Sequence, residues 1–456
     1  MSILGDELKH MDVGDQRLTK RSIEVLETLG AQPQKSIPAA CNGWSETKAA
    51  YRLFDNSKIT AQAVLEPHYA CTAKRIAEYP TVLCVQDTSE MDYTGKNDIQ
   101  GLGPLNYESR RGLYIHPTLA ITPERVCLGI IDSWNWSREA GSLGKDKAAS
   151  RPIEEKESYR WVEGYLRSCE RQAELANTQL IYVADREADI YEIFEAHDKQ
   201  AEQGCAADWL IRGQYNRLLE KGGHLMESIE KTTPLGEIEF TLPAGRGRAS
   251  RTVVQQLYCQ RVTLKGVYRQ QGRLQNVEVT AILARENNPP KGEKAIEWTL
   301  LTNQKLKTFE EVATRIQWYL CRWQIEVFFK VLKSGCKVEE LQLEKMDRLE
   351  PALAFYMIIA WRVLYVTIMG RSCPEIPCDV IFDTEEWQAV YITTHRKAPP
   401  KTPPSLNEMV RAIATFGGFL DRKGDGEPGV QALWLGLQRV RDFALAIQAS
   451  KTVALE

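Results

Sequence analysis

Residues Trp318–Cys336 read WYLCRWQIEVFFKVLKSGC, and the rest of the chain is organised around this stretch. Wound as one α-helix at about 100° per residue, it gathers its chemistry-bearing side chains within an arc of about 80°. A separate apolar arc of about 100° is expected to face the core, and Trp323 and Val327 occupy the remaining flank. The pattern predicts a mostly buried helix. The chemistry-bearing residues are Tyr319, Arg322, Glu326, Lys330 and Lys333, and the apolar ones are Trp318, Cys321, Ile325, Phe328, Phe329 and Leu332.

One acid among several cations suits a site that handles phosphates and a metal ion. A plainer interpretation also fits this stretch. Arg322 with Glu326, and Glu326 with Lys330, are spaced four residues apart, and such pairs commonly decorate a solvated helix face. The helix alone favours that plainer interpretation, so the rest of the chain has to decide.

The composition describes an ordinary soluble protein of several domains. The chain has 456 residues, 43% of them apolar and 26% charged, with a net charge of −3. Any surface that binds nucleic acid must therefore be locally basic. Eleven scattered cysteines without a C-x-x-C pair, and a start without a signal peptide, indicate reduced thiols in the cytoplasm. The most apolar run, Ala352–Met369, is interrupted by Arg362, which favours a buried helix over a membrane span.

The first 72 residues are expected to form short helices. Asp15 precedes the helical pattern RLTKRSIEVLETLG, and two more helical segments follow the breaks at Pro33 and Pro38. A small DNA-binding unit is one interpretation, and solvated helix faces are the other. The local basic residues are Arg17, Lys20, Arg21, Lys48 and Arg52.

Two buried-type strands each end in an aspartate. PTVLCVQD ends at Asp87 and LIYVAD ends at Asp185. If the strands are parallel neighbours, both acids lie at the carboxyl edge of the sheet, where α/β sites form. Taken singly, each acid has a structural explanation, because Asp often ends strands, and Asp185 is also placed to cap a helix that starts near Ala188.

The chain between Asp185 and Glu326 is far too long for one crossover. It reads as an antiparallel β insertion, with a basic rim at AGRGRASR (244–251), before the helix that carries Glu326. A second buried helix is expected over Leu349–Met369, and the prolines of 373–404 indicate a linker or irregular tie. The segments read as strands are DWLIR, GEIEFTL, RTVVQQLYCQRVTL, NVEVTAILA and IEWTLLT.

The tail from Ser405 is helical, then Gly-rich, then helical again. Its last helix repeats Leu433, Leu437, Val440 and Ala444 at helical spacing. This face has two interpretations, a partner surface or packing within its own domain.

Paired His or Cys metal spacing is missing from the sequence, which leaves Asp87, Asp185 and Glu326 as candidate ligands. Oxygen ligands suit Mg²⁺ or Mn²⁺. Two such ions serve both the attacking and the leaving oxygen of a phosphodiester.

The spacing Y-x2-R-x3-E-x6-K, here Tyr319, Arg322, Glu326 and Lys333, resembles the signature of the IS-four family of DDE transposases. VADREADIYEIF, NPPKGEKAIEWTLLT and ALWLGLQ are similar to the transposon-five type of that family. GDQRLTKR and KAAYRLFDN resemble its N-terminal end-binding region. The similarity spans nearly the whole chain.

The resemblance implies a mixed α/β fold, with a ribonuclease-H-like catalytic core, an antiparallel β insertion, and helical domains at both ends. The implied domains are a DNA-end-binding domain at 1–72, a catalytic domain at 73–372 with the insertion at about 209–303, and a linker with a dimerisation domain at 373–456. It assigns Asp87, Asp185 and Glu326 as catalytic, metal-binding residues. It assigns DNA contacts to Tyr319, Arg322, Lys330, Lys333, Arg212 and Trp298, the last two at a hairpin DNA end.

The implied activity is cut-and-paste DNA transposition with Mg²⁺, for which Mn²⁺ substitutes, at two ions per site. Water nicks the element end, the freed 3′-OH forms a hairpin that is reopened, and the 3′-OH joins target DNA. The implied partners are double-stranded DNA and a second copy of the chain, assembled on DNA. Two alternatives stay open: a catalytically idle regulator that occupies DNA ends, and a nuclease without strand transfer. For Trp298 the alternation of Ile296, Trp298 and Leu300 also fits a plain core position.

Overall fold

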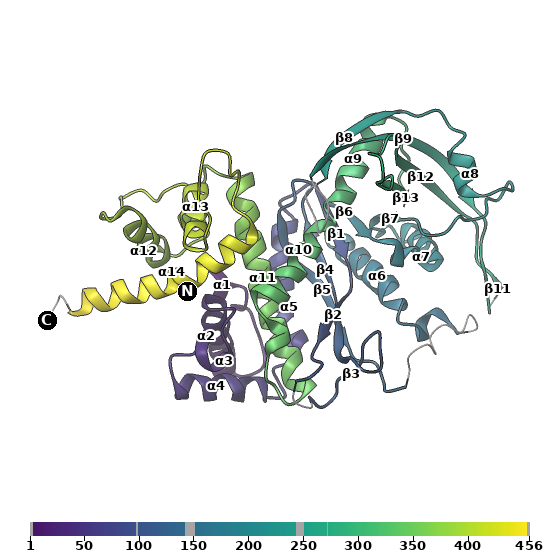
Figure 1. Ribbon diagram of the computed structural model, residues 1–456. Helices are drawn as coiled ribbons and strands as arrows, with labels where there is room; N and C mark the ends of the chain where they lie inside the picture. Colours follow the sequence, from purple (N-terminus) through teal and green to yellow (C-terminus); the bar gives the residue numbers. More distant parts are fainter. Residues whose placement is uncertain (1–2, 97–98, 142–150, 243–249, 271, 454–456) are drawn as a thin grey trace. The chain divides into compact units, whose positions relative to one another are not determined.

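The computed structural model describes residues 3–96, 99–141, 151–242, 250–270 and 272–453 (Figure 1). The chain divides into two compact units. The first comprises Met1–Arg75, Thr88–Leu143 and Gln324–Glu456, and the second comprises Ile76–Asp87 and Gly144–Trp323. The first unit therefore contains both ends of the chain.

Three parallel strands form one part of the second unit. β1 (Thr81–Gln86), β6 (Gln179–Ala184) and β7 (Asp208–Arg212) pair in that order. Their central residues are buried apolar ones, as expected of parallel strands covered on both faces. α6 (Tyr159–Ala173) leads into β6 and contacts β1, and α7 (Tyr191–Glu202) connects β6 to β7. The predicted parallel neighbours β1 and β6 are confirmed.

The sheet of this unit continues with antiparallel strands. β13 (Glu297–Thr302) pairs with β7, and then follow β12 (Val277–Glu286), β9 (Arg251–Leu264) and β8 (Gly236–Leu242). The expectation that DWLIR belongs to the antiparallel insertion is wrong, because β7 runs parallel to β6 after the α7 crossover. The unit also contains α8 (Leu225–Ile229), β10 (Tyr268–Arg269), β11 (Gly272–Arg273) and α9 (Phe309–Leu320), with the short turns η2 (Ile153–Glu155) and η3 (Arg186–Ala188).

Glutamates pair with many arginines of the β insertion. The expected basic rim is therefore partly neutralised, and the part at 244–249 lies outside the described residues. Such pairs fix the strand edges more than they attract an anionic ligand. The pairs are Arg251 with Glu286 and Glu293, Arg261 with Glu278, Arg269 with Glu192, and Arg285 with Glu230 and Glu297.

The first unit begins with the expected short helices. Asp15 caps α2 by accepting a hydrogen bond from the amide of Arg17 at 2.9 Å. The buried stripe of α2 includes Val25, Leu26 and Leu29, which explains why this amphipathic segment is helical. The helices are α1 (Ile3–Asp6), α2 (Gln16–Ala31), α3 (Ile37–Ala40), α4 (Trp44–Phe54) and α5 (Ala61–Ile76).

α11 (Met346–Ser372) is the central helix of this unit and contacts α2, α4, α13, α14 and β5. It is the one helix of the described residues that is long and apolar enough to cross a membrane by length and composition. Most of that apolar window is buried against the unit's own elements, which confirms the predicted buried helix over Leu349–Met369. The strands of this unit are β2 (Ser89–Asp92), β3 (Gly103–Pro104), β4 (Arg111–Ile121) and β5 (Cys127–Trp136), with β2, β3 and β5 all antiparallel to β4.

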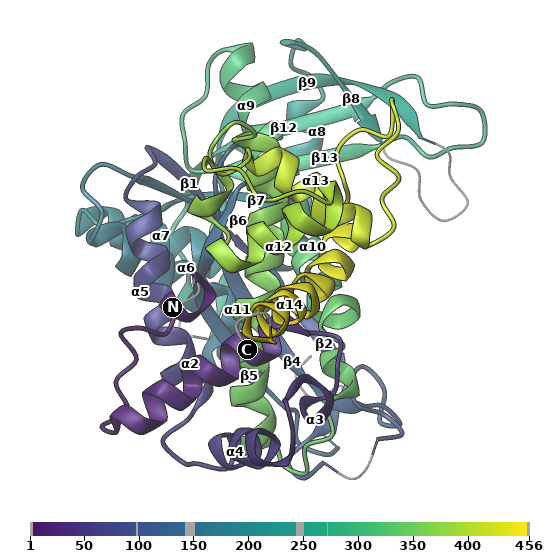
Figure 2. The ribbon, with the colours of Figure 1, turned by 90° about the vertical axis from the view of Figure 1, so that its left-hand side faces the viewer.

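A helix interrupts the proline-rich segment 373–404, so the expectation of a linker is wrong in part. α12 (Thr384–His395) starts at a capping box between Asp383 and Glu386, and η6 (Cys378–Val380) precedes it. α13 (Leu406–Phe416) and α14 (Val430–Val453) complete this region, and both views show α12 and α13 beside α14 (Figures 1 and 2).

Most of the apolar face of α14 is buried by packing against α12 and α13. Leu433 and Val440 are 0% and 2% exposed in a core cluster with α12 and α13, and Leu437 packs against it. Of the two interpretations of this face, packing within the domain is therefore confirmed. The exposed apolar residue Leu445 lies farther along the helix.

The stretch 318–336 is not one continuous helix, which corrects the sequence prediction. α9 ends at Leu320, where the amides of Cys321 and Arg322 bond three residues back instead of four. α10 (Trp323–Lys330) follows, and then a π-helical turn, η4 (Val331–Gly335), with η5 (Val338–Glu340) after it. Gly335 approaches Trp434 so closely that a Cβ would lie 3.1 Å from the ring. The apolar arc is buried as predicted, but Trp323 is 59% exposed.

Candidate active site

Two acids end neighbouring parallel strands in register. The last paired residues of β1 and β6 are Val85 and Val183, and Asp87 and Asp185 each lie two residues further along. Neighbouring strands are about 4.8 Å apart, so both acids lie at one edge of the sheet. The same edge extends to β7, because Ala184 pairs with Ile211 and the next residues are Asp185 and Arg212.

Asp87 and Asp185 both lie near the hydroxyl of Tyr182. Its hydroxyl donates to Oε1 of Gln86 at 2.6 Å and is fully buried. Burial raises the pKa of Tyr182 well above its usual value, and the charges of Asp185 and Asp87 raise it further. Both carboxylates are therefore near enough to the phenol to favour its protonated form.

Three cationic and phenolic side chains of the predicted site surround these acids. Arg322 Nη1 lies 2.6 Å from Oδ2 of Asp87. Burial raises the pKa of the Tyr319 hydroxyl, while Arg322 and a hydrogen bond from Arg212 lower it and the charge of Asp185 raises it. Asp87, Asp185, Arg212, Tyr319 and Arg322 thus form one cluster within the second unit.

Trp298 extends this cluster with an aromatic group. Its ring stacks on Phe240 with the centroids 5.5 Å apart, and it lies 6.1 Å from the ring of Tyr319. Trp298 is half-buried, so part of the ring is accessible. A half-buried ring fits both the core interpretation and the stacking interpretation.

The remaining predicted residues belong to the first unit. Glu326 and Lys330 are exposed one turn apart on α10, and Lys333 lies in the π-helical turn. Lys333 Nζ is 3.8 Å from Oε1 of Glu339, which itself accepts a hydrogen bond from the amide of Asp92 at 3.0 Å. Along the chain, Glu326 follows Arg322 by four residues.

The donor set at the edge fits a hard divalent cation. Within the described ranges, no group of three or more His, Cys, Asp and Glu side chains is arranged to hold a metal ion. Asp87 and Asp185 nevertheless supply carboxylate oxygens side by side, which is the ligand chemistry that Mg²⁺ and Mn²⁺ prefer. Asp185 is also a local cap, because its Oδ1 accepts from the amide of Glu187 at 2.8 Å.

Trp323 is an exposed aromatic residue next to Arg322 that the sequence analysis assigned only to a helix flank. The guanidinium of Arg322 lies 5.5 Å from the centroid of its ring. On a continuous helical wheel Trp323 lies beside the chemistry-bearing arc and away from the apolar one, which agrees with its exposure. Its position directly after the motif arginine was the available signal.

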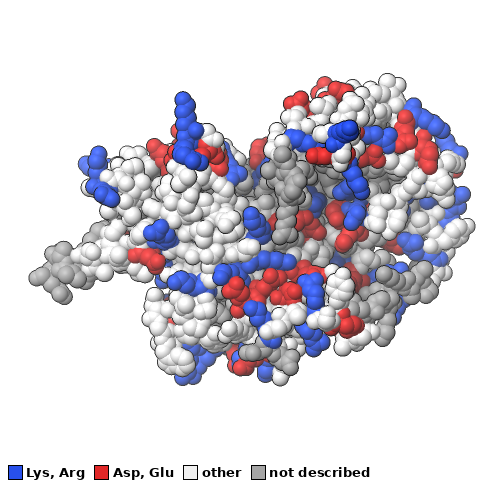
Figure 3. All heavy atoms as spheres, viewed as in Figure 1, with Lys and Arg blue, Asp and Glu red and all other residues white. Residues whose placement is uncertain are grey.

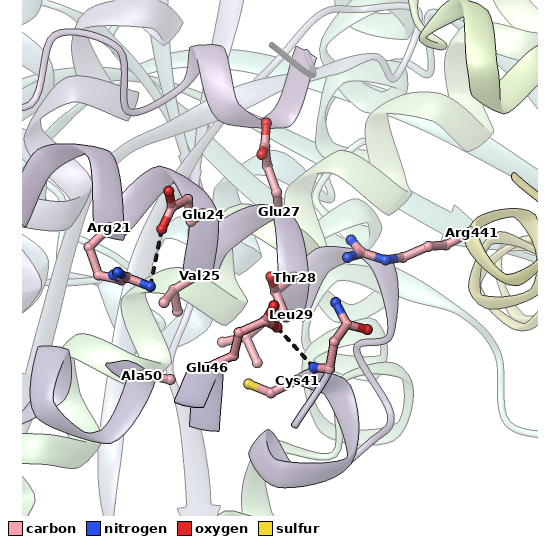
Figure 4. Close-up of a pocket in the computed structure, with 11 residues that line it drawn as sticks. Arg21, Glu24, Val25, Glu27, Thr28, Leu29, Cys41, Glu46, Ala50 and Arg441 are labelled. Atoms are coloured by element: carbon pink, nitrogen blue, oxygen red, sulfur yellow. Dashed lines mark hydrogen bonds and ion pairs between the residues drawn. The ribbon is translucent and has the colours of Figure 1, made fainter. Parts of the chain in front are cut away.

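A pocket of about 380 Å³ is lined by α2, by α4 with the segment before it, and by Arg441 of α14 (Figure 4). Arg21 pairs with Glu24 at 3.2 Å, and Glu46 accepts from the amide of Asn42 at 2.8 Å (Figure 4). Both contacts are local and solvent-exposed, so they contribute little to stability.

An exposed face of α4 carries Trp44, Lys48 and Arg52. The three residues are spaced four apart, which keeps them within an arc of about 80°. All three are exposed, and Trp44 is 77% exposed at the first position of the helix. An exposed aromatic residue beside two cations is typical of a surface that binds nucleic acid, and it favours that interpretation over a plain solvated helix face. On the view in Figure 3, by contrast, acidic and basic side chains are interspersed.

Three family models match the chain. The model described as "Transposase DNA-binding" matches residues 1–59, "Transposase DDE domain" matches 166–362, and "Transposase Tn5 dimerisation domain" matches 358–453. Asp185 and Glu326 fall inside the second range, and Asp87 precedes it. These matches, with the mixed α/β fold, define the class of the protein as a DDE-type DNA transposase that binds DNA and forms dimers. The chain belongs to the Tn5 type of these transposases.

Among solved structures, the chain is similar to one described as "Cryo-EM structure of piggyBac transposase synaptic complex with hairpin DNA". The identity is 8%, the TM-score is 0.38, and the match covers 78% of this chain and 67% of the other.

Proposed function

We propose that the protein is a cut-and-paste transposase in which Asp87, Asp185 and Glu326 hold the divalent cations, Mg²⁺ or Mn²⁺, at two ions per site. The observation that carries the proposal is the edge where Asp87 and Asp185 end β1 and β6 in register. The bound cations supply charge stabilisation at the scissile phosphate. Glu326 enters the proposal through its place in the motif Y-x2-R-x3-E-x6-K.

The cationic residues bind and orient the DNA. Arg322, Lys330 and Lys333 bind the phosphates that flank the cut, and Tyr319 with Arg212 fixes the DNA end beside Asp185. The support is the contact of Tyr319 with Arg212 and the ion pair of Arg322 with Asp87. Each of these groups acts by position and charge, which is where most of the rate of phosphoryl transfer originates.

The reaction sequence is a series of in-line displacements at phosphorus. Water attacks the phosphodiester at the element end and releases a 3′-OH. This 3′-OH attacks the opposite strand and forms a hairpin, and a second water reopens the hairpin. The same 3′-OH then attacks target DNA, and each step breaks one P–O bond and forms another.

Two chains act together on paired DNA ends. The family match over 358–453 supports dimer formation, and the proposal adds that the dimer assembles on DNA. Since Leu433 and Val440 are buried within one chain, the outer half of α14, around Leu445, is the surface proposed for the second copy.

The test is cleavage of DNA that carries the element's flanking inverted repeats, with purified protein and Mg²⁺. Asp87→Asn, Asp185→Asn and Glu326→Gln keep the side-chain shape and remove the charge. Each should bind the end and lose cleavage by about a thousandfold or more, as expected for loss of a metal ligand. Glu170→Gln is the matched control, because Glu170 is exposed on α6 and pairs only at the surface with Arg167. Cleavage that survives in the three variants would refute the assignment.

A catalytically idle regulator is the second candidate. The in-register pair of Asp87 and Asp185 argues against it. A protein that only occupies DNA ends does not need two adjacent carboxylates. Wild-type protein that binds paired ends but neither nicks nor joins them would favour the regulator.

A further inference from the structure

A buried carboxylate fixes the loop that follows β7. Asp189 is 2% exposed. Its Oδ2 accepts hydrogen bonds from the backbone amides of Gln214 at 2.7 Å and Tyr215 at 3.0 Å. Its Oδ1 accepts from Nε of Arg217 at 3.1 Å, and its backbone carbonyl accepts from Nη2 of the same arginine at 2.7 Å. One residue, four positions after Asp185, therefore holds the loop at three points.

This loop lies opposite Trp298, next to the sheet edge where Asp87 and Asp185 end β1 and β6. Arg212 pairs with Leu300, and the amide of Gly213 donates to the carbonyl of Thr299 at 2.8 Å. Continued by one residue, the antiparallel register sets Gln214 opposite Trp298, at about the 4.8 Å spacing of neighbouring strands. Tyr215 follows Gln214 and lies three residues after Arg212 in the chain. The loop therefore places it near the edge of the sheet that carries Asp185 and Arg212.

Tyr215 is an exposed ring on a rigid support. It is 57% exposed, and the guanidinium of Arg217 lies 5.3 Å from its centroid. The same guanidinium lies 5.5 Å and 5.3 Å from the rings of Tyr191 and Phe194, so Arg217 itself is held in place. An exposed aromatic ring offers a face on which a nucleic-acid base stacks. Because Asp189 already fixes the backbone of the loop, binding costs the loop little conformational entropy.

We infer that Tyr215 is a DNA-contact residue that stacks on an unpaired base at the DNA end, and that Asp189 and Arg217 are its positioning residues. The inference rests on the proposed function, because a phosphodiester bound at Asp87 and Asp185 brings the neighbouring bases to this loop. A base is the suited partner since every base offers a flat face to an aromatic ring. Terminal base pairs unpair at the lowest cost.

A purely structural role explains only part of this arrangement. A buried ion pair that ties a loop to its fold accounts for Asp189 and Arg217. It does not account for an aromatic ring that the same contacts keep largely in solvent, where a tyrosine gains nothing from burial.

The test is a binding measurement that needs no cleavage. The full-length protein is titrated, without Mg²⁺, into a duplex with two unpaired terminal bases that include 2-aminopurine, and into the same duplex fully paired. Wild type and Tyr215→Phe should prefer the frayed duplex and change the 2-aminopurine fluorescence. Tyr215→Ala should lower the ratio of the two affinities by about tenfold, the effect of one lost stacked base.

Tyr268→Ala is the matched control. Tyr268 is 77% exposed on the β10–β11 hairpin, and it too has an arginine, Arg273, 5.6 Å from its centroid. The control should keep the wild-type preference. The inference is overturned if wild type shows no preference for frayed ends, if Tyr215→Ala keeps it, or if Tyr268→Ala loses it equally. Since nothing is cut, failure of the catalytic proposal appears separately, in the cleavage assay.

Discussion

Arg322 donates a hydrogen bond from Nη1 to Oδ2 of Asp87 across 2.6 Å, although 235 residues separate them in the chain. The side chains are only 13% and 16% exposed, so water screens this ion pair weakly. A carboxylate proposed to hold a metal ion therefore already has a cation beside it.

Removing that cation should change metal binding. In Arg322→Gln without DNA, Mn²⁺ binding is expected to strengthen by about tenfold, since a competing positive charge is lost. Cleavage should fall in the same variant, because a phosphate contact is lost. Electron paramagnetic resonance of free Mn²⁺ measures the first effect. Arg315→Gln is the control, because Arg315 lies over the ring of Trp318 on the same helix. Unchanged or weaker Mn²⁺ binding in Arg322→Gln would contradict the prediction.

Trp298→Ala should separate the steps of cleavage. If the half-buried ring receives an extruded base, the first nick is spared and hairpin formation slows by roughly ten- to a hundredfold. Gel-resolved kinetics of nick, hairpin and cut product follow this. Phe240→Ala removes the ring that stacks on Trp298 and tests packing alone. Equal slowing of nicking and hairpin formation, with a lower Tm in both variants, would indicate a core role.

Pairing of two DNA ends should depend on the outer half of α14. Leu445 is 44% exposed, and Leu445→Glu should abolish paired-end complexes while binding to a single end persists. Native gels with labelled ends distinguish the two complexes. Gln431→Glu, at the other end of the same helix, is the control. This substitution is cleaner than deletion after Ser405, because deletion would strip α13 and α14 from a buried core. Paired ends in Leu445→Glu would place the dimer contact elsewhere.

End binding should depend on the exposed face of α4. Trp44→Ala and Lys48→Ala are each expected to weaken DNA binding by about three- to thirtyfold, with the lysine variant also showing a shallower salt dependence. Fluorescence anisotropy at two salt concentrations measures both effects. Lys9→Ala, outside α4, is the control. Wild-type affinity in Trp44→Ala would assign DNA binding to another face of residues 1–59.

Stability should fall in mild acid because of a buried histidine. His68 Nδ1 lies 2.6 Å from Oε2 of Glu7, and its Nε2 accepts from the amide of Ile130 at 3.0 Å, so the ring is neutral. Burial lowers the pKa of His68, and the negative charge of Glu7 raises it by less. Arg75 also pairs with Glu7 and partly neutralises that charge.

A histidine with a lowered folded-state pKa gains its proton on unfolding, so the free energy of unfolding should fall as pH drops below about 6.5, by about 1 kcal/mol per pH unit. Urea unfolding at pH 7.5 and at pH 5.5 measures it. His68→Gln removes the titrating ring, so its curve should be flatter than that of wild type. An equal slope in both proteins would assign the acid sensitivity to other groups.

The sequence by itself predicted most of the strands and helices and the residue types of the candidate site. Apolar runs ending at Asp87 and Asp185 predicted two buried strands, and the motif from Tyr319 to Lys333 predicted an acid among cations. These are local patterns, and local periodicity is what a sequence displays directly.

Tertiary structure decided the register and the breaks. Only the pairing of Val85 with Val183 brings the two aspartates to one edge, and the end of α9 at Leu320 interrupts a stretch whose periodicity reads as one helix. The loop with Tyr215 depends on Asp189, and the motif VADREADIYEIF that contains this residue does not show which distant segment it contacts. Such features arise from contacts between distant segments, whose free energy depends on three-dimensional packing and not on the spacing of residues along one helix or strand.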